Sequence, residues 1–151
     1  MLRQPRLDAP GTLHHLMIRG IEGRKIFEND QDKSDFISRL SQLVEPTGIR
    51  ILTWVLMSNH AHLLVFSGTK GISLFMRRLL TGYAIHYNRR HGRSGHLFQN
   101  RYKSIVCDEE RYLLELVRYI HLNPLRAREV KNLAQLEQYP WSGRWTNKWS
   151  S

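Results

Sequence analysis

The sequence predicts one α+β domain with a ferredoxin-like βαββαβ order, built on a four-stranded antiparallel sheet and followed by a further C-terminal helix. The first observation is a set of short segments in which apolar residues alternate, as in half-buried strands. These segments are 13–19, 49–57, 60–66 and 101–107. The second is a pair of segments, 30–45 and 72–90, in which apolar residues recur at helical spacing. A length of 151 residues suits one such domain.

The first strand, 13–19, is expected to end at Gly20, because glycine interrupts regular structure. The first helix is expected to begin after Asn29, whose side chain can cap free backbone N–H groups. Its apolar spacing continues up to the Pro-Thr-Gly sequence at 46–48, before which we expect it to end. Residues 1–11 contain two prolines and a glycine and are predicted to be an irregular lead-in.

The second and third strands, 49–57 and 60–66, are predicted to form an antiparallel hairpin around a tight Ser58-Asn59 turn. The second helix follows at 72–90, and the fourth strand begins after a polar loop. Three acidic residues at 108–110 then favour the start of a third helix, where the helix dipole attracts negative charge. We expect that helix to run to about residue 123.

The chain is expected to form a single domain over 1–151, with a core at about 11–130 and a short tail at 131–151. Three tryptophans of the tail occur every four residues, which would let them pack as one stripe on the domain. They are Trp141, Trp145 and Trp149. A proline and a glycine among them argue against a regular helix there.

The positive charge is concentrated in one part of the chain. The net charge is +10, and residues 46–107 contain nine basic residues and no acidic residue. Such a span attracts a polyanion and predicts a nucleic-acid partner, although a basic surface kept for solubility is the alternative. Aromatic residues lie among the arginines, as in sites where phosphates contact arginine and unstacked bases contact rings. The candidate DNA-binding residues are Arg77, Arg78, Arg89, Arg90, Arg93, Arg101 and Lys103.

The sequence predicts a cytoplasmic protein without a membrane partner. It has no run of 18 apolar residues, and its first residues lack the apolar segment of a secretory signal. The single cysteine, Cys107, cannot form an internal disulfide, which suits a reducing compartment.

Two histidines of the third strand are candidate metal ligands. His60 and His62 are two residues apart, so in a strand both imidazoles point to the same side and provide half of a metal site. Imidazole pairs more often hold Zn²⁺, Mn²⁺ or Ni²⁺ than Mg²⁺, so these residues alone do not select the ion. Ordinary surface or core histidines are the alternative. Packing or phosphate contacts are expected for five others, namely His14, His15, His86, His91 and His96.

The third predicted helix carries a candidate nucleophile. Tyr119 and Asn123 are four residues apart, so their side chains lie one helical turn apart on one face. A phenol with a pKa near 10 is a poor nucleophile at neutral pH, so it would need a cation beside the reacting group. Tyr112 is the competing nucleophile, and a packed rim tyrosine is the alternative. Asn123 precedes Pro124, where an asparagine is also an ordinary helix end.

Three motifs in this order resemble the REP-associated tyrosine transposases. They are SNHAHLL at 58–64, YNRRHGRSG at 87–95 and YIHLNP at 119–124. This family belongs to the single-tyrosine HUH nucleases, together with insertion-sequence transposases, and the resemblance covers roughly residues 11–130. The spacer Ala61 is smaller than the apolar residue usual in the family, and the tail is short.

The resemblance implies that His60 and His62 bind a divalent metal, Mg²⁺ or Mn²⁺, with Asn123 as third ligand. It implies that the Tyr119 oxygen attacks single-stranded or hairpin DNA and forms a 5′-phosphotyrosine, which a second strand's hydroxyl can reseal. The expected protein is then a nucleoid-associated prokaryotic DNA transposase. Relatives include monomers and homodimers, and that choice is left open.

Two other functions fit the same residues. The first is a noncatalytic module of the same fold that binds hairpin or single-stranded nucleic acid. The second is a metal-dependent hydrolase that uses water and leaves free 5′-phosphate ends.

Overall fold

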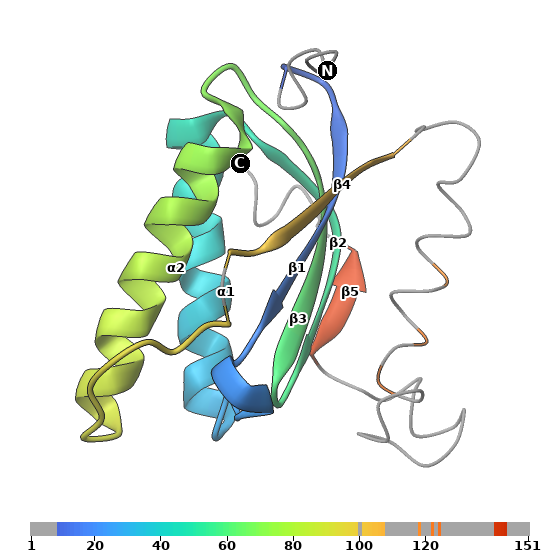
Figure 1. Cartoon of the computed structure of the whole chain (residues 1–151). Helices are drawn as coiled ribbons and strands as arrows, with labels where there is room; N and C mark the ends of the chain where they lie inside the picture. The colour runs from blue at the N-terminus through green and yellow to red at the C-terminus, as the bar shows by residue number, and fades with distance from the viewer. Residues whose placement is uncertain are drawn as a thin grey trace, which may run out of the picture.

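The computed structural model of the chain describes residues 9–99, 101–107, 118, 122, 124 and 141–144. The elements within these residues are β1 (Leu13–Arg19), the short 3₁₀ helix η1 (Ile21–Gly23), α1 (Asp30–Thr47), β2 (Arg50–Met57), β3 (His60–Phe66), α2 (Gly71–Arg90), β4 (Lys103–Cys107) and β5 (Ser142–Arg144). Both long helices lie on one side of the sheet, as Figure 1 shows.

The sheet has the strand order β4-β1-β3-β2-β5, and all its described pairs are antiparallel. The first four strands have the order of a ferredoxin-like fold, which confirms the predicted α+β class. The fifth strand is one more than the sequence predicted. The residue register pairs Thr53 of β2 with Arg144 of β5, and the Leu56 backbone N–H donates to the Trp141 carbonyl at 2.7 Å. A three-residue strand is too short to show an alternating pattern, so this strand could not be predicted from the sequence.

The core lies between the sheet and the two helices. The main cluster includes Leu16 and Leu63 from the sheet, which are fully buried. Phe36 of α1 and Tyr83 of α2 meet at a ring-centroid distance of 5.3 Å and an angle of 82°. Edge-to-face packing of this kind adds to the burial energy and fixes how the helices lie on the sheet.

Helix α1 begins where the sequence predicts and ends two residues later. The Asn29 side chain accepts a hydrogen bond from the Asp32 backbone at 3.0 Å and caps the first turn. Pro46 lies in the last turn, where its missing N–H removes only one helical bond. The Thr47 hydroxyl donates to the Leu43 carbonyl, and Gly48 ends the helix with a φ of 74°. The expected stop before Pro46 was therefore wrong by less than one turn.

A buried carboxylate joins the start of α1 to the end of α2. Asp32 is fully buried and accepts the Glu28 backbone N–H at 2.8 Å. Arg90 lies 2.9 Å from one of its oxygens, and His91 Nε2 lies 2.9 Å from the other. Arg90 also pairs with Asp35 at 3.2 Å. The charge of Arg90 is therefore used within the fold.

The third predicted helix lies outside the described residues, except for three positions. Arg118, Leu122 and Pro124 have helical conformation, and Pro124 is buried. No described helix combines the length and apolar character needed to cross a bilayer.

Candidate active site

The two predicted metal ligands lie on the face of the sheet that points away from α1 and α2. Alternate residues of β3, including Ala61 and Leu63, belong to the core cluster beneath the helices. Leu64, on the opposite face, belongs to a second, smaller apolar cluster. His60 and His62 alternate with the core residues and therefore share this second face. The prediction that both imidazoles lie on one side of the strand is confirmed.

The two rings are close and held in place. Their centroids are 5.3 Å apart at an angle of 84°, and the residues are 8% and 2% exposed. His60 Nδ1 lies 2.7 Å from Asn59 Oδ1, so this ring nitrogen donates to the amide oxygen. His62 Nδ1 lies 2.9 Å from Nε2 of a third histidine, His15. Each ring is thus oriented through its Nδ1 atom.

The turn that presents His60 is fixed by the segment after β1. The backbone N–H of Gly20 donates to the Asn59 carbonyl at 2.9 Å. The N–H groups of Ile26 and Phe27 both donate to the Ser58 carbonyl, at 2.8 and 3.1 Å. These bonds confirm the predicted Ser58-Asn59 turn and hold its position against the end of the sheet.

His15 is a site residue that the sequence analysis assigned to packing or phosphate contact. It comes from β1 and is 8% exposed, and the His15 and His62 ring centroids are 5.1 Å apart. Burial lowers the pKa of His15 below its ordinary value, which favours the neutral ring. Its proximity to His62 depends on the register of β1 against β3, where His62 is paired with Met17. The role of His15 could not be predicted from the sequence, because the sequence does not reveal the register between β1 and β3.

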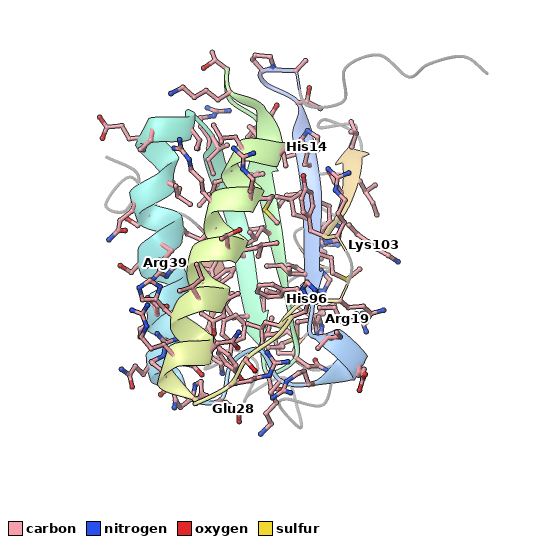
Figure 2. The ribbon with its side chains drawn as sticks, turned by 60° about the vertical axis from the view of Figure 1, so that its left-hand side comes forward. His14, Arg19, Glu28, Arg39, His96 and Lys103 are labelled. Carbon is pink, nitrogen blue, oxygen red and sulfur yellow. The ribbon has the colours of Figure 1, made fainter. Side chains whose placement is uncertain are left out.

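Two exposed cations lie on the same face of the sheet as the histidines. Arg19 of β1 is paired in register with His60. Lys103 of β4 is paired with Met17, which is itself paired with His62. Figure 2 labels Arg19 and Lys103 on these neighbouring strands. Lys103 is one of the predicted DNA-binding residues, whereas Arg19 is not among them because it precedes the basic span.

The predicted nucleophile Tyr119, its competitor Tyr112 and the predicted ligand Asn123 lie outside the described residues. Their roles stay predictions. Within the described part of the chain, no group of three or more His, Cys, Asp or Glu side chains is arranged to hold a metal ion. The role of His60 and His62 as metal ligands likewise stays a prediction.

Two other tyrosines are structural. Tyr83 and Tyr87 are 0% and 1% exposed. The Tyr83 hydroxyl donates to the Ile26 carbonyl, and the Tyr87 hydroxyl donates to Glu28 Oε2 at 3.0 Å. Burial raises the pKa of Tyr87 to about 12 and raises that of Tyr83 further. Neither phenol is suited to attack a substrate.

Residues 11–123 match the family model described as IS200-like transposase. The chain belongs to this family. Transposases cut DNA and transfer its strands, and the matched region runs from just before β1 through both histidines to Asn123.

Solved structures agree with the fold of this IS200-like transposase. A REP-associated tyrosine transposase bound to a REP hairpin has a TM-score of 0.71 at 18% identity, covering 94% of this chain and 82% of its own. A Deinococcus radiodurans R1 protein assigned as a transposase has a TM-score of 0.54 at 14% identity, covering 79% and 95%. The tRNA(His) guanylyltransferase of Saccharomyces cerevisiae has 0.51 at 11% identity, covering 91% and 74%. A comparison with curated proteins found no significant match.

The structure divides the seven basic residues predicted to bind DNA into two groups. Arg90 is paired with two carboxylates, and Arg93 donates to Asn88 Oδ1 at 3.0 Å and to the His96 carbonyl at 2.6 Å. These two arginines shape the end of α2 and the loop after it. The other five are exposed in this transposase, and their contact with DNA stays a prediction: Arg77, Arg78, Arg89, Arg101 and Lys103.

Proposed function

We propose that this transposase cleaves and rejoins single-stranded or hairpin DNA through a 5′-phosphotyrosine intermediate formed on Tyr119, with Mg²⁺ or Mn²⁺ as cofactor. The observation that carries the proposal is the pair His60 and His62, buried side by side on the face of the sheet that points away from α1 and α2. A matching relative was solved with a REP hairpin bound, which supports hairpin DNA as the partner.

The histidine pair fits a divalent metal. Metal-binding histidines typically donate their second ring nitrogen to a neighbour, which fixes the tautomer and the ring orientation. His60 has this arrangement with Asn59, and His62 can have it with His15. Nε2 of each ring would then be the ligand atom, with Asn123 proposed as the third ligand. A metal bound there would polarise the scissile phosphate and neutralise developing negative charge.

Tyr119 would supply the nucleophile. Its phenolic oxygen would form a bond to phosphorus while the bond from phosphorus to the 3′ oxygen breaks. The phenol loses one proton in this step, and the leaving 3′ oxygen gains one to become a hydroxyl. The phosphotyrosine conserves the bond energy, so that a second 3′-hydroxyl can displace the tyrosine and reseal the strand. Conservation of the bond energy suits strand transfer better than degradation of the DNA.

The neighbouring cations would hold the substrate. Arg19 lies in register with His60, and Lys103 lies on the same face as His62 but is separated from it by β1. Arginine and lysine at these positions would contact phosphates next to the scissile bond. We place the protein with the nucleoid in a prokaryotic cytoplasm because DNA is its proposed substrate. The homodimer stays a prediction.

A covalent-adduct assay tests the proposal. Hairpins taken from the DNA that flanks the chain's own gene are labelled at the 3′ end, incubated with the protein and Mn²⁺, and separated under denaturing conditions. The wild type should produce a labelled protein band, which EDTA and Tyr119→Phe should abolish. Tyr112→Phe is the matched control and should leave the band intact.

The other two functions give different results in the same assay. A noncatalytic binding module would shift the hairpin under native conditions but form no adduct with any hairpin. A hydrolase that uses water would release free 5′-phosphate ends and would stay active as Tyr119→Phe.

A further inference from the structure

We propose that Arg93 is a positioning residue for His60, and that it acts through the loop 91–99 and the end of β1 without contacting the metal or the DNA. The motif at 87–95 predicts DNA contacts for its arginines, but the Arg93 side chain is bonded to atoms of the chain itself. The inference rests on the proposed function, because it assigns a support to one of the two proposed metal ligands.

Arg93 holds the loop in one shape. Its guanidinium donates to Asn88 Oδ1 at 3.0 Å, to the Gly95 carbonyl at 3.3 Å and to the His96 carbonyl at 2.6 Å. Asn88 Nδ2 donates to the same Gly95 carbonyl at 3.0 Å. Gly95 has a φ of 89°, a left-handed conformation that glycine adopts readily. Because a guanidinium presents its N–H groups in a rigid plane, one side chain holds three acceptors in a fixed geometry.

The start of the loop is fixed to α1 and α2. His91 Nε2 lies 2.9 Å from the buried Asp32 carboxylate, and the His91 and Tyr87 ring centroids are 4.4 Å apart. The Arg93 backbone N–H donates to the Asn88 carbonyl at 2.8 Å. The loop therefore leaves α2 in one direction, and the bonds of the Arg93 side chain determine how it continues.

The far end of the loop is bonded to the end of β1. Phe98 forms an antiparallel backbone bridge with Gly20. On either side of this bridge, one more backbone hydrogen bond joins the two segments, at 2.9 and 2.8 Å. These bonds are donated by Ile21 to Leu97 and by Gln99 to Arg19. Figure 2 labels Arg19 and, on the adjoining segment, His96, whose carbonyl Arg93 holds.

The end of β1 in turn holds the turn that presents His60. The Gly20 N–H donates to the Asn59 carbonyl at 2.9 Å, and Asn59 Oδ1 accepts from His60 Nδ1 at 2.7 Å. Gly20 is closely packed, because an added Cβ there would collide with the Arg24 carbonyl oxygen. A displacement of Gly20 by the loop therefore has little free space to move into and is passed on to Asn59.

The second imidazole provides an internal reference. His62 is oriented through His15, which lies nearer the start of β1. The bonds from the loop reach only the last residue of β1 and the two residues after it. Loss of the Arg93 bonds should therefore change the ring of His60 and spare that of His62.

Histidine side-chain NMR tests the inference on the full chain, without metal or DNA. At about pH 8, where an ordinary histidine is neutral, the ring nitrogen shifts report which nitrogen carries the proton. In the wild type, His60 should carry it on Nδ1. In Arg93→Ala, His60 should show a mixture of both tautomers, whereas His62 should keep its wild-type signals. Mn²⁺ affinity should fall by about tenfold, the lower end of the loss expected when a metal ligand loses its hydrogen-bond partner.

Three further variants separate positioning from charge. Arg93→Lys keeps the charge but loses the planar fork, so it should behave like Arg93→Ala. Asn88→Ala leaves the charge unchanged and removes an acceptor and a donor of the same set of bonds, so it should change His60 in the same way. Arg89→Ala removes an exposed charge close to the loop and should leave both histidine rings and the Mn²⁺ affinity unchanged. Urea unfolding checks that each variant is folded.

Several results would overturn the inference. The first is a wild-type tautomer of His60 in both Arg93→Ala and Asn88→Ala. The second is an equal change at His60 and His62, which would mark a general loss of structure. The third is a normal His60 ring with weaker hairpin binding in Arg93→Ala that Arg93→Lys restores, which would make Arg93 a phosphate contact. If the wild type binds no Mn²⁺, the proposed metal site fails, while the tautomers still decide whether Arg93 positions His60.

Discussion

His15 Nε2 and His62 Nδ1 lie 2.9 Å apart, in a buried contact between two strands that are distant in sequence. A hydrogen bond between two imidazole nitrogens needs one donor and one acceptor, so the pair has two tautomeric arrangements. Only the arrangement in which His62 donates through Nδ1 gives His62 Nε2 the lone pair that a cation needs. In the proposed site, His15 therefore positions His62 and selects its tautomer.

Replacing His15 tests this positioning role. His15→Ala should weaken Mn²⁺ binding by about 10- to 100-fold, the usual loss when a hydrogen-bond partner of a metal ligand is removed. Mn²⁺ affinity can be measured by titration calorimetry on the full chain. His14→Ala is the matched control, because His14 is also buried in the same strand but its ring Nδ1 lies 2.9 Å from the Ser104 hydroxyl. Equal Mn²⁺ affinities for the two variants would show that His15 does not position His62 for metal binding.

Arg19 should act on DNA and not on the metal. Arg19→Gln should lower the rate of adduct formation by at least about tenfold, because it removes a cation in register with His60. Mn²⁺ affinity should stay unchanged. Arg24→Gln, an exposed residue beyond the end of β1, serves as control and should keep the wild-type rate. A normal rate for Arg19→Gln would show that the scissile phosphate does not lie beside Arg19.

Asp32 should be a stability residue. Asp32→Ala should reduce the free energy of unfolding by about 3 kcal/mol, since it leaves Arg90 and His91 without their buried acceptor. Asp35→Ala should cost about 0.5–1 kcal/mol, because Asp35 is partly exposed where it pairs with Arg90. Urea unfolding measures both. Similar losses of stability in the two variants would contradict the role of Asp32 as the buried carboxylate that joins α1 to α2.

The buried tyrosines predict a loss of stability at high pH. Burial raises the pKa of Tyr87 to about 12 and raises that of Tyr83 further, whereas an unfolded tyrosine ionises near 10. Their stabilising contribution is therefore complete below pH 10 and is lost as the pH rises towards 12. Urea unfolding at pH 9 and pH 11 should show the loss, and Tyr87→Phe should show less of it. A pH-independent stability in this interval would contradict the burial.

The sequence predicts the parts of this structure that depend on local periodicity. The strands β1 and β3 and the capped start of α1 occur where alternation and capping place them, and His60 and His62 share a face because a strand repeats every two residues. The contact between His15 and His62 depends on strand register, which no local pattern contains. Charge counting likewise cannot separate exposed Arg77 from Arg90, whose partners lie on another helix.

The most direct measurement is mass spectrometry of the denatured covalent complex after protease digestion. We expect one modified peptide, in which Tyr119 carries a nucleotide through its 5′-phosphate, and almost none of it with His62→Ala. Linkage to Tyr112 or to another residue, or efficient cleavage by the wild type with no linked peptide, would contradict the proposed role of Tyr119.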